Sequence, residues 1–332
     1  MNYDTYVSSV TNINMSTTST STLSDISKSI NINTHDTILI SGCGGGYDIF
    51  TGLPLYFELL SKHTTNHFVI ANLSFTHIDL LKKFSVSNRH YYKVKFDDSL
   101  SDDKLTFFPE YELSRQLNKE VYCFVDDGLV ALQAAYTELV KDLNINIIFL
   151  CDGGCDSIMS GIEYDLGTPV EDMMSIYIVD TLLKNKLINN AYLTLLGTTV
   201  DTFIEIHHDD YIANVNQLKN KGGLLYTAQL SISDSYVNQY INIFSKCHPK
   251  NSIINCCIVA SLEGNYGDYQ HKYLEGRCEL YKFNITSDTS TYYILSLEKV
   301  AEHVKYLGGL SKFDNSDDID TYIMEYNTQH KK

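Results

Sequence analysis

Three short segments of the sequence combine glycine with aspartate directly after an apolar run, a pairing suited to binding a small ligand. In the first, residues 42–48 read Gly-Cys-Gly-Gly-Gly-Tyr-Asp. Glycine permits positive φ and lets a ligand approach the main chain, and the start of a helix offers free N–H groups to an anion. We therefore predict that this loop binds a ligand through Gly44, Gly45 and Gly46, with Asp48 beside it.

The spacing in this first loop excludes two familiar nucleotide-binding motifs. It lacks the third glycine of G-x-G-x-x-G, and no Lys-Ser/Thr pair follows as in a P-loop. Asp48 would repel a phosphate at the same helix end unless a cation or a ribose hydroxyl lay between them. The purely structural alternative is a tight strand-to-helix turn in which Asp48 caps the helix.

The second segment, residues 151–156, reads Cys-Asp-Gly-Gly-Cys-Asp and places two carboxylates around a glycine turn. Carboxylate oxygens suit Mg²⁺ or Mn²⁺, and Mg²⁺ typically uses one or two carboxylates together with substrate phosphate. We predict that Asp152 and Asp156 are both metal ligands and catalytic carboxylates, and that Gly153 and Gly154 contact the ligand. Turn formation by Asx hydrogen bonds is the structural alternative.

Two further acids are candidates for ligand binding at the same site. Asp172 lies in the first turn of a helix that Thr168 would cap and Pro169 would begin, where an acid also complements the helix dipole. Asp201 closes the third segment, residues 197–201, which follows another apolar run. A loop or N-cap role is the alternative for Asp201.

Apolar runs typical of strands alternate with helical patterns along most of the chain, which predicts a Rossmann-like α/β fold: a mostly parallel sheet with helices on both faces. Ligands of such sheets bind outside the carboxyl ends of the strands, where the three segments fall. The expected strands are Thr37–Ser41, His67–Leu73, Tyr91–Phe96, Val121–Asp126, Asn146–Cys151, Asn190–Leu196, Ile253–Ser261 and Tyr292–Leu297. The expected helices are Ile49–Ser61, Thr76–Phe84, Leu129–Asp142, Val170–Lys186, Ile212–Asn220, Tyr236–Ser245 and Glu298–Tyr306.

The organisation expected from composition is one large domain between two tails. Residues 1–34 are rich in Ser, Thr and Asn and are predicted to be a disordered tail. Residues 35–321 would form a single Rossmann-like domain with an elaborated C-terminal half. Residues 322–332 would form a C-terminal tail.

Charge and cysteine content restrict the partners and the compartment. The 332 residues carry a net charge of −16 and only three arginines, so neither nucleic acid nor an anionic membrane is expected as a partner. No secretory segment or membrane-spanning apolar stretch is recognisable, and most of the eight cysteines lie in apolar runs. We therefore expect a cytoplasmic, reduced protein.

These segments resemble the signatures of the family called domain of unknown function 1152. Residues 44–48 are similar to its Gly-Gly-Gly-Gly-Asp signature, with Tyr47 in place of the fourth glycine. Residues 152–156 resemble its Asp-x-Gly-Gly-Asp-like turn, and residues 168–172 its Ser-Pro-x-x-Asp helix start. The resemblance, over roughly residues 36–230, implies a shared site on a Rossmann-like fold but supplies no reaction.

The leading hypothesis is an enzyme that binds a nucleotide or a phosphorylated or sugar-like metabolite and hydrolyses it or transfers a group with the help of Mg²⁺ or Mn²⁺. One carboxylate would act as general base. A non-catalytic nucleotide or metabolite sensor would use the same residues without turnover. In a structural, oligomeric scaffold, the glycine loops would be turns only.

Overall fold

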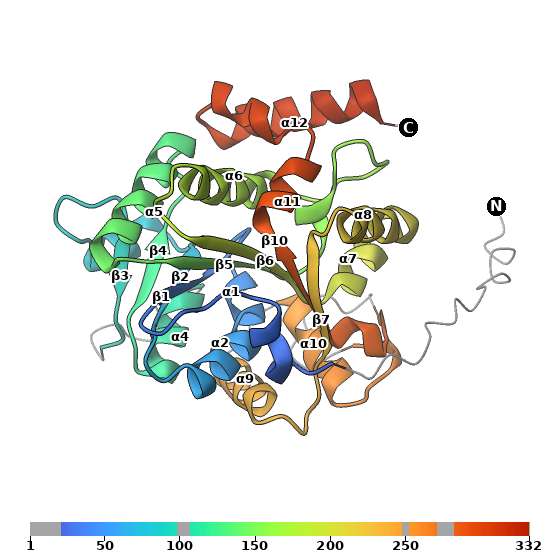
Figure 1. Ribbon diagram of the computed structural model, residues 1–332, viewed down its shortest axis with the longest axis horizontal. Helices are drawn as coiled ribbons and strands as arrows, with labels where there is room; N and C mark the ends of the chain where they lie inside the picture. The colour runs from blue at the N-terminus through green and yellow to red at the C-terminus, as the bar shows by residue number, and fades with distance from the viewer. Residues whose placement is uncertain (1–20, 98–106, 248–251, 271–281, 332) are drawn as a thin grey trace, which may run out of the picture.

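The architecture is a central eight-stranded sheet with helices on both faces, as Figure 1 shows. This computed structural model describes residues 21–97, 107–247, 252–270 and 282–331. Within the sheet the strands follow the order β3-β4-β2-β1-β5-β6-β10-β7, and β3 and β10 run in the direction opposite to the other six strands. The predicted fold class, a mostly parallel Rossmann-like α/β fold, is confirmed.

The strands of the main sheet share short, mostly apolar sequences. They are β1 (Thr37–Gly42), β2 (His67–Leu73), β3 (Tyr92–Val94), β4 (Val121–Phe124), β5 (Ile147–Asp152), β6 (Asn190–Leu195), β7 (Leu224–Gln229) and β10 (Thr291–Ser296). A separate hairpin pairs β8 (Gly267–Tyr269) with β9 (Phe283–Ile285). The helices are α1 (Asp48–Thr51), α2 (Leu53–Lys62), α3 (Ile78–Leu81), α4 (Pro109–Leu117), α5 (Leu129–Leu143), α6 (Val170–Lys184), α7 (Thr198–Ile204), α8 (His208–Asn220), α9 (Ser235–Lys246), α10 (Ile253–Leu262), α11 (Leu297–His303) and α12 (Ser316–His330).

Two hydrophobic cores lie on opposite faces of the sheet, and the sequence of β5 shows why. Ile148 and Leu150 belong to the core beneath α5, α6, α11 and α12, whereas Ile147 and Phe149 belong to the core beneath α1, α2, α9 and α10. Successive side chains of a strand point to opposite faces, so a strand buried on both needs a continuous apolar run. The central strands are therefore fixed on both sides, which gives the loops at their ends a rigid base.

The strand order places the glycine loop (residues 42–48) and the acid loop (residues 151–156) side by side. From β1 the chain builds the sheet outward through β2 and β4, then returns to add β5 on the other side of β1. Gly42 pairs with Cys151 in the parallel register, and the Cys43 N–H donates to the Cys151 carbonyl at 2.8 Å. The point where the order reverses is where open α/β sheets bind ligands.

One predicted strand is wrong, and three strands, β7, β8 and β9, were missed. Residues 253–261 form helix α10, with Ser252 capping the N–H of Asn255. The eighth position of the main sheet belongs instead to β7, an edge strand that pairs antiparallel with β10. The other predicted strands form within two residues of their expected bounds.

Both predicted tails contain ordered, packed residues. Residues 21–34 include a 3₁₀ helix, Leu23–Lys28, whose Leu23 and Ile26 are fully buried. At the other end, α12 continues to His330 and buries Ile323, so residues 322–330 are helical rather than a tail. Residues 1–20 and Lys332 lie outside the described residues.

Two further observations concern the compartment. No described helix has the length and apolarity needed to cross a bilayer. The seven cysteines in the described part of the chain form no disulfide, and all seven are buried. The eighth, Cys278, lies in the undescribed segment 271–281.

Candidate functional site

Three of the predicted acids meet at the carboxyl edge of the sheet. Asp48, Asp152 and Asp172 each offer a carboxylate oxygen, and these three oxygens lie within 4.8 Å of one another. Asp48 is the first residue of α1, Asp152 is the last residue of β5, and Asp172 lies in the first turn of α6. The sequence prediction paired Asp152 with Asp156 as metal ligands, whereas the structure groups Asp152 with Asp48 and Asp172.

The glycine loop seats Asp48 rather than presenting a free anion cradle. The Gly44 N–H donates to Oδ2 of Asp48 at 3.0 Å, and the Gly46 N–H donates to the Leu73 carbonyl at 3.1 Å. A side chain on Gly44 would collide with Asp172, because its Cβ would lie 2.7 Å from Oδ2. The first loop therefore brings two acids together, and it uses N–H groups that the sequence prediction assigned to the ligand.

The acid loop also needs its two glycines, because a side chain at either position would collide with a neighbouring carboxylate. A Cβ on Gly154 would lie 2.1 Å from Oδ2 of Asp201, and one on Gly153 would lie 3.0 Å from Oδ1 of Asp48. Asp201, in the first turn of α7, accepts a hydrogen bond from the Cys155 N–H at 2.6 Å. Asp201 is thereby held against the acid loop, as predicted for a member of the cluster.

Asp156 lies beside the three grouped acids and links the acid loop to α6. Its Oδ2 accepts a hydrogen bond from the Thr168 N–H at 3.1 Å. The predicted N-cap role of Thr168 is wrong, because Pro169 occupies that position and no side chain caps the helix. Burial raises the pKa of Asp156 to about 6.

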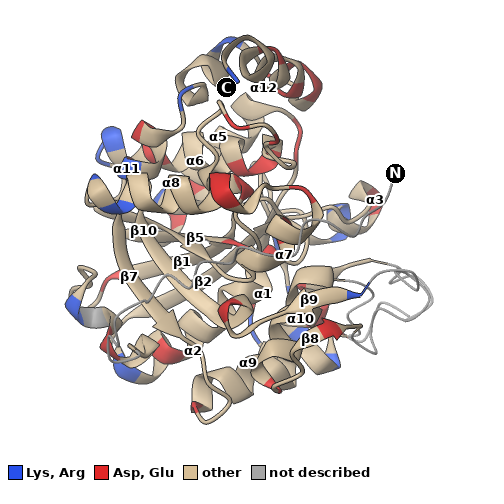
Figure 2. Cartoon of the chain, turned by 90° about the vertical axis from the view of Figure 1, so that its right-hand side faces the viewer, with Lys and Arg blue, Asp and Glu red and all other residues tan. Residues whose placement is uncertain are grey.

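The acid cluster consists of five aspartates: Asp48, Asp152, Asp156, Asp172 and Asp201. Its negative charge is not offset by an ion pair with a lysine or arginine of the described residues. Burial, followed by the charge of Asp156, raises the pKa of Asp48 to about 7. Burial and neighbouring carboxylates hold the pKa values of Asp152, Asp172 and Asp201 well above the usual range. No lysine or arginine among the described residues forms a salt bridge with any of the five acids. Figure 2 shows acidic segments near α1 and the end of β5.

One oxygen in the cluster lacks any partner. Oδ1 of Asp172 is buried without a hydrogen bond, and the residue is 6% exposed. Glu163, equally buried, shows what a satisfied carboxylate looks like in this protein: it accepts hydrogen bonds from the N–H groups of Ser160, Gly161 and Ile162 and from Asn214 Nδ2. Because buried polar groups are normally paired, Asp172 is the less well satisfied of these two carboxylates.

The thiols of the site cysteines favour the protonated form in the metal-free protein, and the three grouped donor atoms are all carboxylate oxygens. Burial raises the pKa of Cys43 and Cys155 well above the usual range, and nearby carboxylates raise it further. A thiolate is the form that binds metal or attacks a substrate. The donor set is therefore made of carboxylate oxygens, which favours a hard cation such as Mg²⁺ or Mn²⁺.

Two residues that support the glycine loop were missed from the sequence. Asn72 Nδ2 donates to the Gly46 carbonyl at 2.8 Å and to Oε1 of Glu110 at 2.7 Å. Both side chains are fully buried, and burial raises the pKa of Glu110 to about 7. An asparagine within the apolar strand His67–Leu73 was the available signal.

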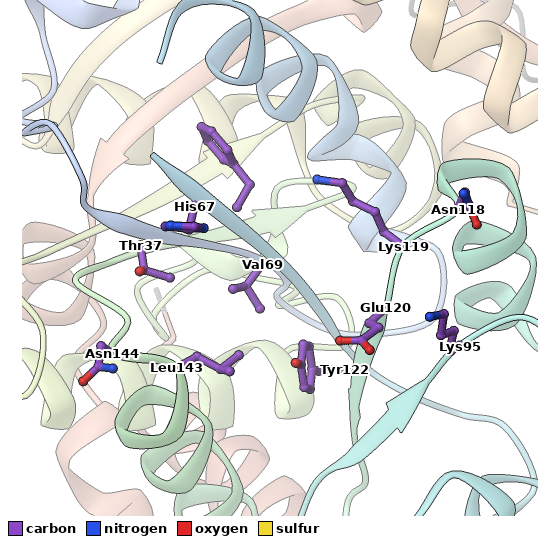
Figure 3. A pocket seen from close by; sticks show the side chains of 11 residues that line it. Thr37, His67, Val69, Lys95, Asn118, Lys119, Glu120, Tyr122, Leu143 and Asn144 are labelled. Atoms are coloured by element: carbon purple, nitrogen blue, oxygen red, sulfur yellow. The ribbon is translucent and has the colours of Figure 1, made fainter. Parts of the chain in front are cut away.

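A cavity of about 620 Å³ opens at the opposite edge of the sheet, near the starts of β1 and β2 (Figure 3). Asn118 and Asn144, which line it, are the C-caps of α4 and α5. The two lysines of this cavity, Lys95 and Lys119, complement the negative ends of these helices. It contains none of the predicted site residues.

A comparison with known protein families matches residues 76–324 to the protein family of unknown function DUF1152. The chain belongs to this family. The match contains the acid loop, Asp172 and Asp201, and begins after the glycine loop. The curated proteins contain no match to the chain.

Proposed function

We propose that the protein is a Mg²⁺- or Mn²⁺-dependent enzyme that hydrolyses, or transfers a group of, a phosphorylated or nucleotide metabolite. The observation that supports this most directly is the convergence of Asp48, Asp152 and Asp172, with one oxygen of Asp172 buried and unpaired. A divalent cation would satisfy that oxygen and offset the repulsion among the acids. It would also let an anionic substrate approach a negatively charged edge.

Asp156 is the candidate general base. Its pKa of about 6 lies close to neutral pH, where a base can be unprotonated and still accept a proton well. In hydrolysis of a phosphate ester, the oxygen of water forms a bond to phosphorus while the bond from phosphorus to the leaving oxygen breaks. The proton of the water passes to Asp156, and the leaving oxygen takes a proton from solvent. A bound divalent cation supplies charge stabilisation for the phosphoryl oxygens.

The proposed setting is the cytoplasm, and the proposed partner is a small molecule rather than a nucleic acid or a membrane. Seven buried cysteines that form no disulfide within the described residues are typical of a reducing compartment. A net charge of −16 disfavours binding to phosphate backbones and anionic lipids. A homo-oligomer is compatible with this function and is not required by it.

The proposal is tested by titrating Mn²⁺ into the purified protein by calorimetry. We expect one site in the wild type and at least a tenfold weaker affinity in Asp172→Asn. Asp180→Asn is the matched control, because Asp180 lies on the same helix but pairs with Lys184 at 2.6 Å. Folded wild-type protein that binds no Mn²⁺, or equal losses in both variants, would contradict the metal site.

Turnover separates an enzyme from a sensor. Release of inorganic phosphate from sugar phosphates and nucleotides would be measured with Mn²⁺ for the wild type and for Asp156→Asn. An enzyme predicts metal-dependent release that falls at least a hundredfold in the variant. Metal-dependent ligand binding without release from any compound would assign the site to a sensor.

A further inference from the structure

Tyr306 lies where the segment after the acid loop meets the helices on the α6 side of the sheet. It precedes the 3₁₀ helix Leu307–Lys312, which packs against α6. The neighbouring Lys305 N–H donates to the Ser160 carbonyl at 3.0 Å, and a Cβ on Gly161 would lie 2.5 Å from Cδ1 of the Tyr306 ring. The ring is therefore held against the chain just beyond the acid loop.

The hydroxyl group of Tyr306 is buried and unpaired. The side chain is fully buried, and its oxygen has no hydrogen-bond partner among the residues that the structure describes. Three other fully buried tyrosines bond through the hydroxyl to a side chain, at 3.2, 2.8 and 3.1 Å: Tyr136, Tyr240 and Tyr292. A buried hydroxyl without a partner costs free energy, so this one does not serve to hold the fold together.

The charges near this hydroxyl place it on the side of the acid cluster. Burial raises the pKa of Tyr306 well above the usual range, and the charges of Asp156, Glu163 and Asp172 raise it further. A charge shifts a pKa chiefly when it lies within about 4–6 Å. The hydroxyl therefore points towards Asp156 and Asp172 without bonding to either, and it keeps its proton at neutral pH.

We propose that Tyr306 is a ligand-binding residue of this site, and that its hydroxyl donates a hydrogen bond to an oxygen held by the divalent cation at Asp48, Asp152 and Asp172. The inference rests on the proposed function, because it requires that cation. The oxygen belongs either to a water on the cation or to a phosphate group, since Mg²⁺ typically keeps several waters and also binds substrate phosphates.

This assignment accounts for two unpaired buried groups with a single occupant. A cation satisfies Oδ1 of Asp172, and an oxygen on that cation accepts the hydrogen bond of Tyr306. A neutral donor suits the position, because a lysine or arginine there would pair with the acids and compete with the cation. The alternative is that Tyr306 serves only through its ring, in which case phenylalanine would replace it without loss.

The test is Tyr306→Phe, which removes the hydroxyl and keeps the ring contacts with Gly161 and Tyr326. Mn²⁺ is titrated into the metal-free protein by calorimetry, and inorganic phosphate is then titrated into the protein saturated with Mn²⁺. At least one of the two affinities is expected to fall about tenfold, as for residues that orient the ligands of a metal. A loss of Mn²⁺ affinity assigns the hydroxyl to a water on the cation, and a loss of phosphate affinity alone assigns it to a phosphate oxygen.

Thermal unfolding in EDTA adds a measurement on which a structural role would act differently. Tyr306→Phe should not lower the midpoint of unfolding, because the hydroxyl loses no hydrogen bond. Tyr292→Phe is the matched control, since Tyr292 is equally buried but bonds to Thr194 Oγ1 at 3.1 Å. It should lower the midpoint by about 2 °C and leave both affinities unchanged.

The possible failures of this inference and of the proposed function are distinct. If Tyr306→Phe lowers the unfolding midpoint as much as Tyr292→Phe does, the hydroxyl belongs to the fold and the inference is wrong. If the wild type binds Mn²⁺ and both affinities survive Tyr306→Phe, the inference is wrong and the metal site stands. If the wild type binds no Mn²⁺, the proposed function and this inference are both contradicted.

Discussion

At the scale of single residues, the buried acids of this protein divide into two kinds. Glu163 is surrounded by donors, and although burial alone would raise its pKa, hydrogen bonds from Ser160 and Asn214 bring it below the usual value. Asp172 is just as buried but faces other carboxylates and keeps one oxygen unpaired. A saturated carboxylate stabilises a fold, whereas a repelled one costs stability until a ligand binds.

Asp172→Asn is therefore expected to stabilise the metal-free protein by about 1 kcal/mol. Because the pKa of Asp172 is raised on folding, its destabilising effect appears above its unfolded pKa and grows as pH rises. The increase in the free energy of unfolding caused by Asp172→Asn should therefore be larger at pH 8 than at pH 5. Urea unfolding in EDTA at both pH values measures it.

Glu163→Gln is expected to lower the free energy of unfolding of the metal-free protein, opposite to the effect of Asp172→Asn. It replaces an acceptor of several hydrogen bonds by a group that can accept fewer, and should cost about 3 kcal/mol. If both substitutions destabilised the metal-free protein equally, the distinction between functional and structural acids would be wrong.

Gly154→Ala is expected to destabilise the fold by about 2 kcal/mol, because the new methyl group would overlap Asp201. Displacement of Asp201 should also disturb the acid loop, so Mn²⁺ affinity should fall. Gly308→Ala is the control, since a Cβ at Gly308 meets nothing within 4 Å. Thermal unfolding and Mn²⁺ titration of both variants decide whether Gly154 is needed for space.

At the scale of elements, the N-terminal 3₁₀ helix is the clearest departure from the sequence prediction. Leu23, Ile26 and Ile30 belong to the core beneath α2 and α9, and Tyr226 of β7 donates its hydroxyl hydrogen bond to the Thr22 carbonyl at 2.7 Å. Four large apolar residues among many Ser, Thr and Asn in residues 21–34 were too few to suggest a packed segment. Their burial depends on partners more than 200 residues away.

Leu23→Ala should consequently lower the free energy of unfolding by about 3 kcal/mol, as for a fully buried leucine. Val130→Ala, at a side chain 68% exposed, should change it by no more than about 0.5 kcal/mol. Urea unfolding of the two variants gives the comparison. Equal, small effects would restore the view of this segment as a tail.

The limits of sequence reasoning have identifiable physical causes. The run at 147–151 was assigned correctly as a strand, but the similar run at 253–261 forms α10, because periodicity cannot distinguish short apolar strands from buried helices. The glycine and acid loops were found because glycine and aspartate directly after a strand have few other uses. The proximity of Asp48 and Asp172 could not be predicted from the sequence, because it depends on how α1 and α6 are placed around β5.

At the scale of the whole molecule, one hydrogen-bonded chain connects the helices on the α6 side of the sheet. His303 of α11 bonds to Asn214 Oδ1 of α8 through Nε2 at 2.6 Å, and Asn214 Nδ2 bonds to Glu163 at 2.8 Å. Asn327 then joins α12 to the same loop. These contacts join α8, α11 and α12 to the loop that carries Glu163, so the stability of this side of the protein depends on them.

His303 should make the stability of this assembly depend on pH. Burial lowers its pKa to about 4 in the folded protein, against its ordinary value of 6.5. The unfolded chain then binds more protons between these values, so the free energy of unfolding falls as pH drops from 6.5 to 4, by up to about 3 kcal/mol. Above pH 6.5 the contribution is fully present. The acid cluster acts in the opposite direction, because its pKa values are raised on folding.

The two effects are separated by comparing the wild type with His303→Gln, which retains an amide able to bond to Asn214 and cannot titrate. The difference in unfolding free energy, wild type minus variant, should decrease steadily from pH 7 to pH 4.5. The contribution of the acid cluster cancels from this difference because both proteins contain the cluster. Urea unfolding in EDTA at half-unit pH steps measures this difference. A difference independent of pH would mean that His303 is accessible to protons in the folded state, and that the network joining α8, α11 and α12 is looser than its contacts imply.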